Sequence, residues 1–159
     1  MHVRRLLAAT LACAAAVLGA SFLLGNGRAQ GGKVVHTCSA ADKQFLQTVR
    51  ENMTQLGYWS DALLQNDVAP RVVVKQARSE ADQIAATSPD DPTLTTTRTM
   101  LQTMLLQYGD AIRAKFHGGD AGIHMKLSYN LANQVHYLLV GAQPALAAQG
   151  CDVSSLMAS

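Results

Sequence analysis

The chain has 159 residues, 48% of them hydrophobic, with 13 Lys and Arg residues against 11 Asp and Glu residues. Arg4, Arg5 and Arg28 lie in an N-terminal segment that we expect to be removed, which leaves ten basic and eleven acidic residues. This near-neutral charge, without a cluster of basic and aromatic residues, argues against a nucleic-acid-binding protein.

Residues 1–29 have the three-part layout of a secretory signal peptide. Arg4 and Arg5 form a positively charged n-region, which is followed by an uncharged apolar run over residues 6–24. Gly27 and Ala29 are the small residues expected at a cleavage site. We therefore expect export by the Sec route, as a secreted protein or one of the periplasm and cell envelope. The apolar run is longer than in a usual signal peptide, so an uncleaved membrane anchor is the alternative. Only in that case do we expect a membrane partner.

Two cysteines, Cys38 and Cys151, remain after the signal peptide and bracket nearly all of the mature chain. In an oxidising compartment an isolated pair of this kind predicts a disulfide. A metal site that combines both cysteines with His36 and Asp152 is the alternative.

The first two predicted helices cover residues 42–64 and 70–86. Apolar residues recur at every third or fourth position, the spacing of one helix face. Ser39 is the expected N-cap of the first helix, with the charge of Asp42 favouring its first turn. Pro70 suits the first turn of the second helix because an N–H at that position would have no partner. The expected inward residues are Phe45, Val49, Met53, Leu56, Trp59, Leu63, Val73, Val74, Ala77, Ala81 and Ile84.

A third helix is predicted from Pro92, with Asp91 as its N-cap, and Gly118 ends it. Asp120 caps a fourth helix that runs to about residue 149, and we expect Pro144 to end or kink it early. Six threonines between residues 93 and 103 are poor helix formers, so packing must hold the third helix. The expected inward residues are Leu94, Leu101, Met104, Leu105, Tyr108, Ile112, Phe116, Ile123, Leu127, Leu131, Val135, Leu138, Ala142 and Leu146.

Four amphipathic helices with short connections predict an all-α fold, an antiparallel up-down four-helix bundle. An even number of antiparallel helices returns the chain to the end where it started, so this topology independently brings Cys38 beside Cys151. We expect residues 30–37 to form a short exposed lead-in, residues 38–151 the bundle, and residues 152–159 a flexible tail.

The sequence carries no catalytic motif and no cofactor signature. We therefore expect a binding, interaction or structural protein without a cofactor, and not an enzyme. One alternative is a metal site formed by His117, Asp120 and His124 around the turn between the third and fourth helices, because imidazole and carboxylate groups suit zinc or copper. The competing interpretation makes His124 a core histidine that is hydrogen-bonded to Tyr108, Arg113 or the backbone, and leaves His117 solvated.

The second alternative is a haem site. Met53 and His136 are each fifteen residues from their nearer cysteine, so they should lie at a similar height in the bundle. A Met/His pair can ligate haem iron. The helical pattern turns His136 away from the predicted core, however, which argues against this site.

The fourth helix also has a second, half-apolar face. Met125, Tyr129, His136 and Val140 follow one another at spacings of four, seven and four residues. A helix whose core face is already complete does not need this row for packing. We therefore predict a contact surface, either for self-association with a second copy or for another protein partner.

Overall fold

The computed structural model describes residues 37–157 of the chain. The chain divides into two units, Met1–Val34 and Val35–Ser159, and every described residue belongs to the second. The predicted signal peptide, the alternative membrane anchor and most of the lead-in therefore lie outside the described residues.

The described residues form four long helices and a short fifth one, with no strand among them. This confirms the all-α class and the four predicted helices, and each predicted boundary lies within two residues of the observed one. None of these helices is apolar over a stretch long enough to cross a lipid bilayer. The elements are α1 (Ala40–Leu64), α2 (Pro70–Ala85), α3 (Pro92–His117), α4 (Ala121–Ala148) and α5 (Ser154–Met157).

The helix starts are set by local hydrogen bonds that the sequence predicts. At α1 the Ser39 hydroxyl accepts from the Asp42 N–H at 3.0 Å, and the Ser39 N–H donates to the Asp42 carboxylate at 3.1 Å. The side chains of Asp91 and Asp120 cap α3 and α4 in the same way, each by accepting two backbone N–H groups. Gly118 ends α3 with φ of 79°, a left-handed conformation that favours glycine.

The threonine-rich start of α3 satisfies its hydroxyl groups within the helix. The hydroxyls of Thr96, Thr97, Thr99 and Thr103 each donate to the backbone carbonyl four residues earlier. Thr97 is fully buried, so tertiary packing holds this part of α3 despite its low helix propensity.

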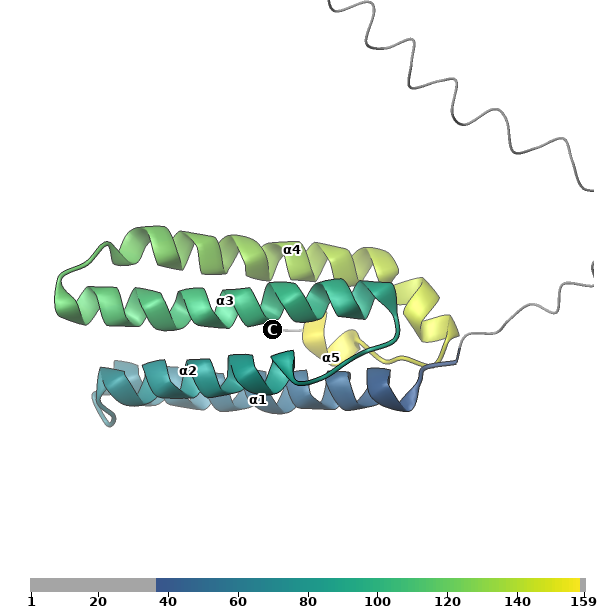
Figure 1. Cartoon of the computed structure of the whole chain (residues 1–159), viewed down its shortest axis with the longest axis horizontal. Coiled ribbons are helices and arrows are strands. Elements are labelled where there is room, and N and C mark those ends of the chain that lie inside the picture. Colours follow the sequence, from purple (N-terminus) through teal and green to yellow (C-terminus); the bar gives the residue numbers. More distant parts are fainter. Residues whose placement is uncertain (1–36, 158–159) are drawn as a thin grey trace, which may run out of the picture. The chain divides into compact units, whose positions relative to one another are not determined.

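The four long helices lie side by side, and consecutive helices are packed together. Figure 1 places the α1–α2 and α3–α4 connections at one end of the domain and the α2–α3 connection toward the other, from which the chain turns back so that α5 lies nearer the middle. The core includes Phe45, Leu46, Val49, Ala81, Ile84, Leu94, Leu101, Met104, Leu105, Val135, Leu139, Leu146 and Val153.

The predicted core face is wrong at the loop end of the domain, where three of its residues are exposed. Phe116 is 54% exposed, Ile123 is 55% exposed and Leu127 is 45% exposed. A row of residues spaced by four rotates about 40° around an α-helix with each step, because 3.6 residues make one turn. From Ile123 to Val135 this drift reaches about 120°, so the row leaves the buried face. A step of seven residues from Val135 leads instead to Ser128, which is buried.

The predicted flexible tail is also wrong for residues 152–157, which fold back onto the helices. Val153 is 1% exposed and belongs to the core, and Leu156 packs against it. The Cys151 N–H donates to the Leu146 carbonyl at 2.8 Å, which joins the segment to the end of α4. The physical reason is that Val153 and Leu156 gain more from apolar burial than the short segment loses in chain freedom.

Pro144 does not end α4, which continues to Ala148. The last turns of this helix, yellow-green to yellow in Figure 1, bend away from the direction of the turns before them. A proline inside a helix removes one backbone hydrogen bond and favours such a bend.

Cys38 and Cys151 are joined in a disulfide with their Cα atoms 5.1 Å apart, as predicted. The Cys38 N–H also donates to the Gln149 carbonyl at 2.6 Å. The segment just before α1 is thereby joined to the segment that follows α4.

Candidate functional site

The candidate site is a groove between α1 and α4. No Cα atom of α1 lies within 8 Å of a Cα atom of α4, whereas α3 packs closely against both α2 and α4. The space left between α1 and α4 is a groove of about 730 Å³. Its volume falls in the range of about 300–1,000 Å³ that is usual for pockets that bind small molecules.

The floor of the groove is apolar. Leu101 and Met104 of α3 line it, together with Val49 of α1 and Leu139 of α4. Leu156 of α5 also lines it, so the folded-back tail contributes to the site.

The two walls carry the polar and aromatic groups. Arg50 and Met53 lie one turn apart on the α1 wall. The α4 wall carries Tyr129, His136 and Tyr137. The rings of His136 and Tyr137 make an edge-to-face contact with their centroids 5.7 Å apart. Tyr129 is 66% exposed and Tyr137 is 74% exposed, so much of this wall is open to solvent.

The groove brings together Met53 and His136, the residues of the predicted haem site. Both side chains line it, Met53 from α1 and His136 from α4. His136 is exposed, as expected for a residue turned away from the core. It nevertheless lines the groove because, in the described part of the chain, α1 does not pack directly on α4.

The residues of the predicted interaction face are all exposed, Met125 and Val140 at 45% each. Tyr129 and His136 line the groove, whereas the other two lie outside its lining. Sequence reasoning missed Tyr137, although it directly follows His136 on the same helix.

The residues of the predicted metal site have separate roles in the structure. His117 is exposed at the end of α3, and the Asp120 carboxylate caps α4. His124 is half-buried rather than a core residue, and its Nδ1 atom hydrogen-bonds the side-chain oxygen of Gln107 at 2.8 Å instead of one of the expected partners. Within residues 37–157 these three side chains do not form a group with ligand atoms within 4.8 Å of one another.

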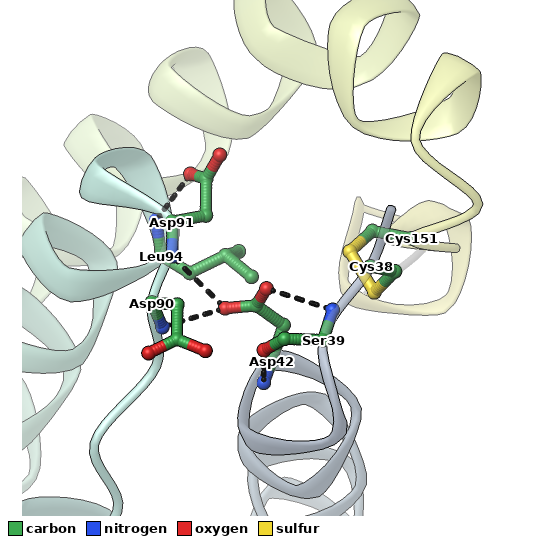
Figure 2. The surroundings of a disulfide bond; sticks show 7 residues. All are labelled: Cys38, Ser39, Asp42, Asp90, Asp91, Leu94 and Cys151. Atoms are coloured by element: carbon green, nitrogen blue, oxygen red, sulfur yellow. Dashed lines mark hydrogen bonds between the residues drawn. A yellow bond between two sulfur atoms is a disulfide. The ribbon is translucent and has the colours of Figure 1, made fainter. Parts of the chain in front are cut away.

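One group of three donors does meet that distance in the described part of the chain: Cys38, Asp42 and Cys151. Figure 2 shows why it serves structure rather than metal binding. The two sulfur atoms are bonded to each other, and one Asp42 oxygen accepts the N–H groups of Asp90 and Asp91 at 2.8 and 3.0 Å. Burial raises the pKa of Asp42, but the Asp91 N–H and its other hydrogen-bond donors lower it more, so the net shift is downward. The predicted alternative donor His36 lies outside the described residues.

A second groove, of about 530 Å³, lies between α2 and α3 and is lined by basic side chains. Arg71, Lys75 and Arg78 come from α2, and Arg113 comes from α3. Asp110 binds two of them, at 3.5 Å from Arg78 and 2.8 Å from Arg113, which offsets part of the positive charge.

Besides Asp42, a second buried ionisable group lies outside both grooves. Glu80 of α2 is 0% exposed, and neither carboxylate oxygen makes a well-formed hydrogen bond to a described residue. Burial raises the pKa of Glu80 to about 7, and the side chain of Gln76 offsets only part of this rise.

The α1–α4 groove is therefore suited to holding a molecule. It combines an apolar floor with two thioethers, one imidazole, one guanidinium, two phenols, one hydroxyl and one amide group. Its described lining contains the hydroxyl of Thr54 but no Ser, Cys or carboxylate. Comparisons of the chain with protein-family models, with curated proteins and with solved structures found no match.

Proposed function

We propose that this chain is an exported binding protein, without catalytic activity, that holds an apolar molecule of cofactor size in the α1–α4 groove. The observation that carries the proposal is the groove itself, about 730 Å³ in volume with an apolar floor. The signal-peptide layout of residues 1–29 and the disulfide between Cys38 and Cys151 support export. The short connections between consecutive helices support an antiparallel up-down order.

The driving force for binding is the removal of apolar surface from water. Each 100 Å² of apolar surface that the ligand and the groove cover together contributes about 2.5 kcal/mol. The partly buried Met53 and the exposed Tyr129 supply surface of this kind on opposite walls.

An apolar fluorescent dye of the anilinonaphthalene type tests this proposal. In Ala132→Trp an indole projects from a position that lines the groove, and we expect dye affinity to fall at least about tenfold. The matched control is Gln134→Trp, which places the same side chain at an exposed position of α4 outside the groove lining. Equal dye affinity of wild type and folded Ala132→Trp would contradict the proposal.

Self-association through α4 is the second candidate function. Its support is the exposed row formed by Met125, Tyr129, His136 and Val140, to which the structure adds the exposed Tyr137. Sedimentation velocity of wild type and Tyr129→Glu tests it, because a buried charge at a dimer contact should shift the equilibrium to monomer. Identical monomer sedimentation for both proteins at high concentration would remove this candidate and leave the groove proposal intact.

A further inference from the structure

We propose that the molecule held in the α1–α4 groove is an iron porphyrin, with Met53 and His136 as its two axial ligands. This inference rests on the proposed function of the groove and names its ligand class. It starts from the placement of one thioether and one imidazole on facing walls of the same groove.

The number of metal-ligating groups selects this ligand class over a bare metal ion. A protein-bound zinc ion takes three or four ligands from the protein, and no group of three His, Cys, Asp or Glu donors within 4.8 Å includes His136 in the described residues. Calcium and magnesium need several oxygen ligands, and the described lining holds no carboxylate. A porphyrin supplies the four in-plane nitrogens itself, so its iron needs only two axial donors, which Met and His provide.

The two proposed ligands reach the groove from different helices. Met53 comes from α1 and His136 from α4, and no described Cα atom of α1 lies within 8 Å of one in α4, so the two helices leave room between them. Met53 is partly buried and packs against the core, which restrains its thioether. The His136 ring contacts Tyr137 edge to face, and no described residue engages its ring nitrogens by a hydrogen bond or ion pair.

The rest of the lining matches the remaining surface of such a ligand. Leu101, Met104 and Leu139 form an apolar floor for the hydrocarbon edge of the ring. Arg50 lies on the same wall as Met53, and its guanidinium is the natural partner for a propionate group. Arg50 also interacts electrostatically with Asp152, so a propionate competes with that carboxylate.

Hemin titration of the full chain, as its host processes it, tests the inference by absorption spectroscopy. We expect one hemin per chain, a shifted Soret band, and the long-wavelength band of methionine-ligated ferric haem. Met53→Leu should abolish that band and lower the reduction potential, because a methionine ligand raises it. His136→Ala should weaken hemin binding at least about tenfold, a loss of about 1.4 kcal/mol.

Two variants serve as matched controls. Met125→Leu and His117→Ala change the same residue types at exposed positions outside the groove lining. Both should keep the wild-type spectrum. The far-ultraviolet circular dichroism of every variant reports whether the helices are intact.

The outcomes separate this inference from the proposed function. Wild type that binds the apolar dye but not hemin overturns the porphyrin and leaves groove binding in place. Hemin binding with the same spectrum and affinity in Met53→Leu and His136→Ala also overturns it. Wild type that binds neither probe overturns both proposals, whereas displacement of the dye by hemin in the wild type supports both.

Discussion

Glu80→Gln should change how the stability of the protein depends on pH. Glu80 is 0% exposed, and its pKa is raised from 4.5 to about 7, chiefly by burial. Between these two pKa values the folded state keeps a proton that the unfolded state has released, so the free energy of unfolding falls as the pH rises. At about 1.4 kcal/mol per pKa unit, the loss reaches about 3 kcal/mol and is complete about one pH unit above the folded-state pKa.

Glutamine has nearly the same shape as glutamate and does not ionise, so the variant should lack this loss. Burying an unpartnered amide has its own cost, of about 1–3 kcal/mol, but that cost does not change with pH. The quantity to measure is therefore the difference in unfolding free energy between Glu80→Gln and wild type. We expect this difference to grow in favour of the variant by up to about 3 kcal/mol between about pH 4.5 and about pH 8.

Urea unfolding followed by fluorescence of Trp59, the single tryptophan, supplies the measurement. The matched control is Glu51→Gln, since Glu51 is exposed on α1 and hydrogen-bonds the Gln47 side chain at 2.8 Å. The control should follow the pH profile of wild type. Parallel profiles for Glu80→Gln and wild type would refute the assignment of Glu80 as a buried carboxyl group that titrates near neutral pH.

Three further predictions concern the packing and the connections of the helices. Leu139→Ala should lower the free energy of unfolding by about 2–5 kcal/mol because Leu139 is fully buried. Leu127→Ala, at a 45% exposed site, should change it by less than about 0.5 kcal/mol. Similar urea midpoints for the two variants would contradict the assigned buried face of α4. Reduction of the disulfide, which spans 113 residues, should cost about 4–5 kcal/mol in the chain-entropy model, and an unchanged urea midpoint in protein whose mass shows two free thiols would argue against it. Asp42→Ala should cost about 2 kcal/mol or more at neutral pH, because backbone N–H groups lose their acceptor. The pKa of Asp42 is lowered from 3.8, so its contribution to the free energy of unfolding is complete above pH 3.8 and is lost as the pH falls through the folded-state pKa. The melting temperatures of variant and wild type should therefore converge in acid.

The helix boundaries were predictable because they depend on residues that are neighbours in the chain. Each N-cap accepts N–H groups only two or three residues further along the chain, from the side chains of Ser39, Asp91 and Asp120. Gly118 ends α3 by its own left-handed conformation. The disulfide was predictable for a different reason, since only two cysteines follow the predicted signal peptide. The heights of Met53 and His136 follow from the same cysteine positions, and the structure places both residues on one groove.

The groove could not be predicted from the sequence. It exists because α1 and α4 do not pack directly on each other. The spacing of apolar residues within each helix does not indicate which pairs of helices pack together and which do not. The role of the tail was hidden for a related reason. Val153 and Leu156 form too short a segment to show a periodic pattern, and their burial depends on where the disulfide places them.

By itself, the sequence determined the helical class, the limits of the four long helices and the pairing of the cysteines, because these depend on capping, on periodicity and on the small number of possible partners. Only the tertiary structure decided which side of α4 is buried. Ile123 and Leu127 look like core residues in the sequence, yet the buried face follows Ser128, Val135 and Leu139. A helix can rotate about its axis by tens of degrees without any change in its local hydrogen bonds, so neighbouring helices select its buried face.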